Sequence, residues 1–244
     1  LPQREIRGHE QFEPHPGGGY YANTDFMPMD SWRILRIMSE FVESFETMSR
    51  MPDNLVAVFG SARTPEDSPD YQAARQTGAM LVKAGYGVIT GGGPGIMGAA
   101  NRGAKEAGGR AIGLNIELPM EQHPNEYQND SMSFRYLFIR KVCFLKYASG
   151  VIVFPGGFGT LDELAEVLTM IQTRKINPIP VILVGKKFWN GFLHWIKETL
   201  VSAGMISEFD QGLYHLVDSA EDAVSYLQAC HRYGRNGTVR SENK

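Results

Sequence analysis

From residue 55 onward, the chain alternates short apolar runs rich in β-branched residues with longer stretches of helical periodicity. Short apolar runs without polar alternation are typical of parallel strands that helices cover on both sides. The predicted strands are Leu55–Phe59, Gly87–Thr90, Arg110–Asn115, Gly150–Phe154 and Pro180–Val184. This pattern predicts an α/β fold with a doubly wound parallel sheet and helices on both faces.

Helices are predicted between and after these strands. Ser68 followed by Pro69 supplies an N-cap and a first helical residue, and Gly85 supplies a stop, so one helix should run to about Ala84. The other predicted helices cover about 96–107, 134–148, 161–174, 188–203 and 220–231.

An N-terminal extension precedes the α/β region. Residues 1–29 are polar and interrupted by proline and glycine, which predicts an arm without regular structure. Asp30 then caps a predicted helix to about Arg50, in which large apolar residues recur every three or four positions: Leu35, Met38, Phe41, Val42, Phe45 and Met48. This stripe should pack either on the chain's own core or on another subunit. The sequence predicts three parts: an arm and helix over 1–50, an α/β domain over 51–232 and a polar tail over 233–244.

Composition narrows the choice of partners. The 244 residues carry a net charge of -3, which gives no general attraction for nucleic acid. The two cysteines, Cys143 and Cys230, cannot form a disulfide framework. There is neither an apolar run of about 18 residues nor a secretory h-region, so we expect a cytoplasmic protein that does not bind membranes.

Three of the loops that leave the predicted strands contain glycine, at 59–63, 90–98 and 154–160. In an open α/β sheet, ligands bind at the carboxyl ends of the strands, where these loops meet. Glycine lets backbone N–H groups approach an anionic oxygen, and the following helix adds its positive end. The second and third loops are therefore predicted to bind phosphate, whereas Gly60 alone equally suits a tight strand-to-helix connection.

The second loop also satisfies the dinucleotide fingerprint GxGxxG over 93–98, with Glu117 at about the spacing of a ribose-binding acid. This favours NAD binding as one alternative. Against it, the motif follows the second strand instead of the first, and another glycine loop converges on the same sheet edge.

The third loop continues into Thr160 and Glu163, which have the spacing of a capping box. We expect the helix dipole to lower the pKa of Glu163 and keep it ionised beside the glycine loop. Such a carboxylate would stabilise the positive charge that develops on a sugar when its glycosidic bond breaks. Arg140 and Lys141 are either cations on a solvated helix face or the cationic wall of an anion site.

Other chemistries lack their motifs in this sequence. The six histidines show no metal-ligand spacing, no GxSxG elbow occurs, and neither phosphate loop ends in the Lys-Ser/Thr of a P-loop. We expect no metal site and no cofactor. The three tryptophans have helical spacings that indicate core or interface positions: Trp32, Trp189 and Trp195.

The segment Pro155–Glu163 resembles the PGGxGTxxE signature of the Lonely guy family, the cytokinin riboside 5'-monophosphate phosphoribohydrolases. Residues 90–98 resemble the family's second glycine loop, and Arg140 with Lys141 its Arg-Lys pair. The resemblance implies a Rossmann-like fold, usually oligomeric, that hydrolyses a nucleoside 5'-monophosphate such as AMP or N6-prenyl-AMP to free base and ribose 5-phosphate. It implies that Arg140 and Glu163 are the catalytic pair. The predicted substrate-binding residues are Gly60, Ser61, Gly92, Gly93, Met97, Glu121, Lys141, Gly156, Gly157, Gly159, Thr160 and Thr169.

Three points stay open at this stage. The family's glutamate before the Arg-Lys pair corresponds to Glu117, Glu121 or Glu126, of which we favour Glu121. Fold and phosphate loops alone are equally compatible with a nucleotide carrier or sensor that does not catalyse a reaction. The family's older label, lysine decarboxylase, would require pyridoxal phosphate on a lysine such as Lys141, without a recognisable partner for the pyridinium.

Overall fold

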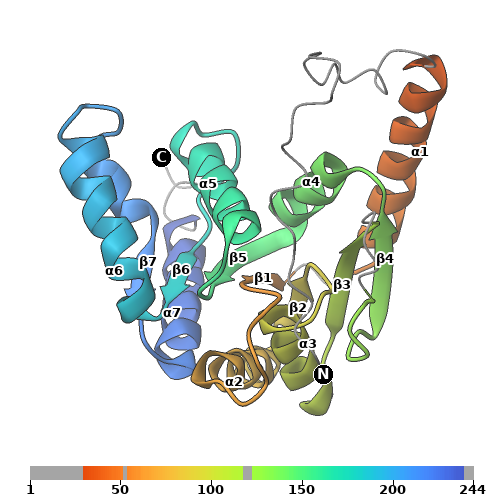
Figure 1. Cartoon of the computed structure of the whole chain (residues 1–244), viewed down its shortest axis with the longest axis horizontal. Coiled ribbons are helices and arrows are strands. Elements are labelled where there is room, and N and C mark those ends of the chain that lie inside the picture. The colour runs from red at the N-terminus through yellow and green to blue at the C-terminus, as the bar shows by residue number, and fades with distance from the viewer. Residues whose placement is uncertain (1–29, 52–53, 118–122, 239–244) are drawn as a thin grey trace, which may run out of the picture.

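The computed structural model describes residues 30–51, 54–117 and 123–238. Their strands form one parallel sheet in the order β4-β3-β2-β1-β5-β6-β7 (Figure 1). The strands are β1 (Leu55–Phe59), β2 (Gly87–Thr90), β3 (Ala111–Ile116), β4 (Asp130–Phe134), β5 (Ala148–Val153), β6 (Val181–Val184) and β7 (His215–Val217). The chain builds outward from β1 in one direction and then from β5 in the other. The predicted doubly wound sheet is thus confirmed, and its switch point lies between β1 and β5.

Helices cover both faces of the sheet. They are α1 (Asp30–Met48), α2 (Pro69–Lys83), α3 (Ile96–Glu106), α4 (Leu137–Tyr147), α5 (Phe158–Gln172), α6 (Lys186–Trp195) and α7 (Ala220–Thr238). Buried residues of α2, α3 and α7 pack on one face, and those of α1, α4, α5 and α6 on the other. Figure 1 shows α1 beside β4 at one end of the sheet and α6 with β7 at the opposite end.

The central strand β1 explains the two layers. Leu55, Ala57 and Phe59 point into one core, and Val56 and Val58 into the other. All five are buried. A strand that is covered on both faces needs an unbroken apolar run, which is the pattern that the sequence shows.

Two strands, β4 and β7, were missed by the sequence prediction. Both lie at sheet edges: β4 has the sequence DSMSF and β7 has only three residues. The helix predicted for 134–148 was wrong in its first part, because Phe134 ends β4 and α4 begins at Leu137. Edge strands can be short and polar, so their apolar pattern is weak.

Helix ends differ from the prediction in the C-terminal half. The helix predicted for 188–203 divides into α6 and a π-helical segment, Ile196–Val201, and a 3-10 helix follows at Glu208–Leu213. Helix α7 continues past its predicted end at His231 to Thr238. The predicted arm, residues 1–29, lies outside the described residues.

The apolar stripe of α1 is divided between the core and the surface. Phe41 and Phe45 pack against the core layer that includes α4, with Phe41 also against Phe138. Leu35, Met38 and Val42 remain exposed in the single chain, together with Trp32 and Ile34. The chain's own core therefore covers only part of the stripe.

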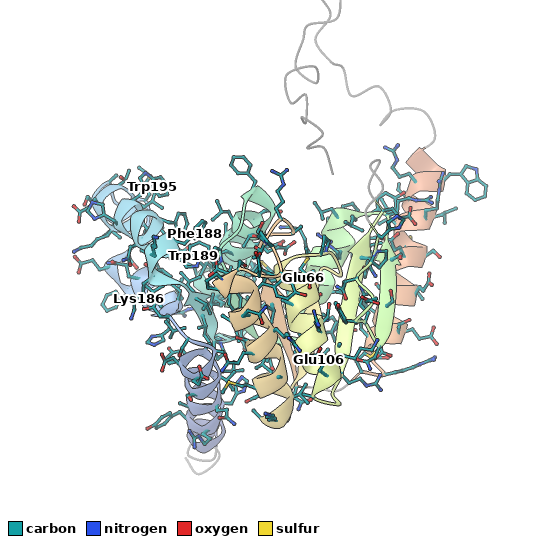
Figure 2. The ribbon with its side chains drawn as sticks, turned by 60° about the horizontal axis from the view of Figure 1, so that its bottom comes forward. Glu66, Glu106, Lys186, Phe188, Trp189 and Trp195 are labelled. Atoms are coloured by element: carbon teal, nitrogen blue, oxygen red, sulfur yellow. The ribbon has the colours of Figure 1, made fainter. Side chains whose placement is uncertain are left out.

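Aromatic residues of α6 and ion pairs of α3 illustrate how the helices pack on the two faces of the sheet. Trp189 of α6 is completely buried and donates from Nε1 to the carbonyl of Val184, which confirms a core position. Phe188 and Trp195 lie half exposed on the same helix (Figure 2). On the opposite layer, Arg102 of α3 binds Glu66 and Glu106, which Figure 2 also labels.

Candidate active site

A cavity of about 670 Å³ opens at the carboxyl ends of the central strands. Such a volume lies in the range of small-molecule sites, and the position is where open α/β sheets bind ligands. Its walls come from the loops after β1, β2, β3, β4 and β5, from α4 and from the first two turns of α5. The predicted residues that line it are Gly60, Ser61, Gly92, Gly93, Met97, Arg140, Gly157, Gly159, Thr160 and Glu163.

Ser61 joins the three glycine loops into one unit. Its backbone N–H donates to the carbonyl of Pro155 at 3.0 Å, and its own carbonyl accepts from the N–H of Ile96 at 3.0 Å. A Cβ on Gly95 would overlap the carbonyl of Ser61, and one on Gly156 would overlap the side chain of Thr160. These two glycines are therefore needed so that the loops can pack together.

The loop after β2 is held by an amide network that the sequence did not reveal. The carbonyl of Gly92 accepts from the backbone N–H of Asn125 at 2.8 Å and from Nε2 of Gln128 at 2.8 Å. Gln128 also bonds Asn115 at the end of β3. Gly92 has a positive φ of 74°, and a Cβ there would overlap Oδ1 of Asn115. The backbone of this loop is thus fixed before any ligand binds.

Helix α5 begins at Phe158, and its N-cap is Gly157. The predicted capping box was wrong: Thr160 already lies inside the first turn, and no side chain caps this helix. Because the helix starts earlier than predicted, Glu163 lies in its second turn. The backbone N–H groups of the first turn, at the positive end of the helix, therefore face the cavity without a side-chain cap.

Gly157 and Gly159 differ from the packing glycines. A Cβ on either would meet no atom within 4 Å, yet both line the cavity. Their missing side chains therefore leave open space beside the helix terminus. Phe158 between them is 91% exposed. This arrangement lets an anionic group come close to the backbone of α5.

Glu163 is the buried carboxyl of the cavity, with 8% of its surface exposed. Burial raises its pKa to about 7, while the positive charges of Lys141 and Arg140 lower it. The expectation that the helix dipole lowers this pKa was wrong, because the dipole acts in the first turn and the burial of Glu163 outweighs it. A carboxyl with a pKa near 7 exchanges its proton easily at neutral pH.

Arg140 reaches the same cavity from α4. Its Nη1 donates to the carbonyl of Leu114 at 3.5 Å, and its guanidinium lies over the ring of Phe144. Burial lowers its pKa, while the charges of Glu163 and Asp162 raise it. Nε is buried and has no hydrogen-bond partner among the described residues. Arg140 therefore keeps donor capacity for an anionic or polar ligand.

Three predicted binding residues do not line the cavity, and a fourth is not described by the structure. Lys141, Gly156 and Thr169 are not among the described residues that line the cavity, and Glu121 lies outside the described residues. Lys141 binds two carboxylates of α5. Thr169 is exposed farther along α5, where its hydroxyl donates to the carbonyl of Ala165.

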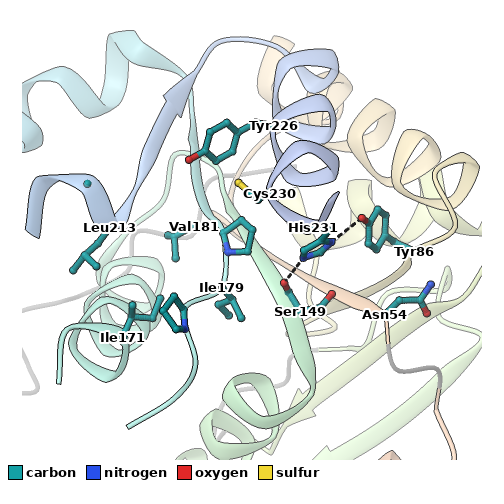
Figure 3. Close-up of a pocket in the computed structure, with 13 residues that line it drawn as sticks. Asn54, Tyr86, Ser149, Ile171, Ile179, Val181, Leu213, Tyr226, Cys230 and His231 are labelled. Carbon is teal, nitrogen blue, oxygen red and sulfur yellow. Dashed lines mark hydrogen bonds between the residues drawn. The ribbon is translucent and has the colours of Figure 1, made fainter. Parts of the chain in front are cut away.

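A second cavity, of about 550 Å³, lies at the opposite, amino-terminal edge of the sheet (Figure 3). Polar and apolar groups contribute about equally to its wall, and Tyr86, His231 and Ser149 form a chain of hydrogen bonds there. Tyr86 lies 2.7 Å from Nδ1 of His231, whose Nε2 lies 2.9 Å from the carbonyl of Ser149. Because a carbonyl only accepts, Nε2 carries the proton and Tyr86 donates to Nδ1. These contacts connect α7 to the amino-terminal edge of the sheet.

The comparisons with known proteins agree with this geometry. Residues 97–227 match a family model described as possible lysine decarboxylase. The cytokinin riboside 5'-monophosphate phosphoribohydrolase LOG of Oryza sativa is 32% identical over 69% of this chain and 70% of its own length. The chain belongs to this phosphoribohydrolase family. A bacterial phosphoribohydrolase from Mycobacterium marinum is 29% identical over 72% of this chain and 92% of its own length.

Solved structures show the same fold as this phosphoribohydrolase family member. A molybdenum cofactor binding protein from Rippkaea orientalis superposes with a TM-score of 0.54 and 24% identity over 74% of this chain and 98% of its own. The molybdenum cofactor carrier protein of Chlamydomonas reinhardtii superposes with a TM-score of 0.54 and 24% identity over 72% of this chain and 96% of its own. At this identity the likeness concerns the fold alone.

Among the described residues, no group of three or more His, Cys, Asp or Glu is placed to hold a metal ion. Within the same residues, no helix is long and apolar enough to cross a membrane.

Asn115 lines the cavity but was not among the predicted site residues. The sequence could have identified it, because it ends a predicted strand at the sheet edge where ligands bind. Asn125 and Gln128 gave no such signal, because only the path of the chain brings them to Gly92.

Proposed function

We propose that this protein hydrolyses the N-glycosidic bond of a nucleoside 5'-monophosphate, AMP or an N6-prenylated AMP, to free base and ribose 5-phosphate. The observation that carries the proposal is the pairing of buried Glu163 with Arg140 in a cavity next to the open N-terminus of α5. Relatives that are named cytokinin riboside 5'-monophosphate phosphoribohydrolases support the same reaction class.

The open helix terminus suits the 5'-phosphate. Gly157 and Gly159 leave room for phosphate oxygens beside the first turn of α5, where backbone N–H groups and the helix dipole favour an anion. Anchoring the phosphate fixes the ribose relative to the walls of the cavity. A nucleoside without phosphate should therefore bind much more weakly.

Glu163 then acts on the ribose. As the bond between ribose C1' and the base nitrogen breaks, positive charge develops on the sugar, and the ionised carboxylate of Glu163 stabilises it. Water supplies the hydroxyl that bonds C1', and the proton released from water balances the proton that the departing base gains. Arg140 offers hydrogen-bond donors beside the carboxylate and holds the substrate in place.

The older interpretation as a lysine decarboxylase fits these residues poorly. A Schiff-base lysine must reach its cofactor with a free amine. The ammonium of Lys141 is held by Asp162 and Glu166, and those contacts raise its pKa although burial lowers it. We therefore favour hydrolysis.

The direct test incubates the wild type with AMP and with N6-prenylated AMP and separates the products by chromatography. We expect free base and ribose 5-phosphate in equal amounts. Glu163→Gln, which keeps the shape but removes the charge, should bind nucleotide and release base about 100-fold more slowly. A wild type that binds AMP and leaves it intact would instead be a carrier or sensor.

We also propose a homo-oligomer, supported by the exposed apolar residues of α1. A cytoplasmic location stays a prediction.

A further inference from the structure

Lys141 lies directly after Arg140 on α4 but does not share its environment. Its side chain is only 11% exposed, and Nζ lies 3.0 Å from Oδ2 of Asp162 and 2.6 Å from Oε2 of Glu166. Both carboxylates belong to α5, one turn apart, and they flank Glu163 in sequence. The described residues that line the cavity include Arg140 and Glu163 but not Lys141.

This arrangement joins the two helices that carry the proposed catalytic pair. Helix α5 places three carboxyl groups near α4: Asp162, Glu163 and Glu166. Without Lys141, Arg140 would be the only described cation that lowers the pKa of Glu163. Like charges at this spacing repel one another. The ammonium of Lys141 balances the charges of Asp162 and Glu166, and Arg140 is left to face Glu163.

The pKa of Glu163 depends on the same cluster. After burial, which raises it, the charge of Lys141 acts to lower it, Arg140 acts in the same direction, and Glu166 and Asp162 raise it. Removing the ammonium would remove a lowering charge and leave two unpaired carboxylates beside Glu163. Its carboxyl would then hold its proton to higher pH.

We propose that Lys141 is a positioning residue: it binds Asp162 and Glu166, fixes α5 against α4, and thereby keeps Glu163 and Arg140 facing the same cavity. This inference rests on the proposed function and departs from the expectation that Lys141 contacts the substrate. A contact to phosphate and a positioning role differ in what they change. Loss of a phosphate contact raises KM, whereas loss of positioning lowers kcat.

The experiment compares Lys141→Met with the wild type and with Lys146→Met, which removes an exposed cation from the same helix. For Lys141→Met we expect kcat to fall about tenfold or more, KM for AMP to stay within about threefold, and the pH midpoint of kcat/KM to move upward. Lys141→Arg should restore most of the turnover, and Lys146→Met should change none of these values. The side chains of Asp162 and Glu166 are 56% and 30% exposed, so their carboxylates can turn toward solvent although Oε2 of Glu166 is buried, and Lys141→Met should still fold.

A double-mutant cycle with Glu166→Gln tests the contact itself. We expect the effect of Lys141→Met on kcat to shrink in the Glu166→Gln background, because the partner is already lost. Additive effects, or a tenfold rise in KM with unchanged kcat, would overturn the inference.

A titration by NMR with ¹³C-labelled glutamate gives a readout that needs no turnover. The midpoint of Glu163 should rise in Lys141→Met, and an unchanged midpoint contradicts the inference. A wild type that releases no base contradicts the proposed function instead, and this titration still decides whether Lys141 controls Glu163.

Discussion

Glu163 on α5 and Arg140 on α4 line one cavity, and each shifts the pKa of the other. Burial raises the pKa of Glu163 to about 7, and the guanidinium of Arg140 opposes that rise. Burial likewise lowers the pKa of Arg140, and the carboxylate opposes that change. Neither side chain would be favourable there alone, because an isolated buried charge is costly. Such a pair is typical of a site in which chemistry takes place.

The pH dependence of activity follows from this pair. The proposed mechanism needs the ionised carboxylate, so kcat/KM should rise with pH through a midpoint near 7 and fall on the acid side. Steady-state kinetics with AMP between pH 5 and 9 measure it. An activity that declines as pH rises through 7 would show that the protonated acid is the active form.

Glu163 should also cost stability. Its pKa is about 7 in the folded chain against an ordinary 4.5, so between these values the folded state keeps a proton that the unfolded state loses. Stability therefore falls as pH rises through this window, by roughly 3 kcal/mol in total. Glu163→Gln should raise Tm at pH 8 and leave it nearly unchanged at pH 4. Equal Tm values at pH 8 would contradict the raised pKa.

The glycines of the site should divide into two classes. Gly92→Ala should destabilise the protein and abolish turnover, because its Cβ would overlap Asn115 and its φ is positive. Gly157→Ala should fold normally, because its Cβ meets open space, but bind AMP more weakly. Thermal melts and AMP titrations separate these effects.

Gly191→Ala is the control for both changes, because Gly191 lies on exposed α6 with open space around its Cα. It should raise stability by up to about 1 kcal/mol, since alanine favours a helix. Unchanged AMP affinity in Gly157→Ala would place the phosphate elsewhere.

The contacts of His231 should matter for stability and not for catalysis. His231→Ala removes hydrogen bonds to Tyr86 and to the carbonyl of Ser149, at the sheet edge opposite the active site. We expect a loss of about 1 to 2 kcal/mol in the free energy of unfolding with kcat unchanged. Urea unfolding measures this, with His194→Ala on exposed α6 as control. A large fall in kcat would link this edge to the active site.

The exposed stripe of α1 should form a subunit contact. Light scattering should show the wild type as a dimer or larger, and Leu35→Glu combined with Val42→Glu should reduce its mass, because both residues are exposed and apolar. Lys83→Glu, on the opposite layer, should leave the mass unchanged. A wild type that is strictly monomeric and fully active would refute the oligomer.

The sequence by itself determined the layout of the molecule. Its apolar runs identified the five inner strands, because a strand covered on both faces has few polar positions. Glycine clusters after those strands predicted the loops, the motif at 155–163 predicted Glu163, and the resemblance to the family's Arg-Lys pair predicted Arg140. These signals are local, so one sequence is enough to detect them.

Only the tertiary structure decided how the site works. The pKa of Glu163 depends on burial beneath neighbouring helices, and the partners of Lys141 come from a different helix. Asn125 and Gln128 reach Gly92 from more than thirty residues away in the chain. The edge strands β4 and β7 likewise pair with strands that their own residues do not specify. Contacts of this kind depend on distances in space, which hydrophobic periodicity and motif spacing do not encode.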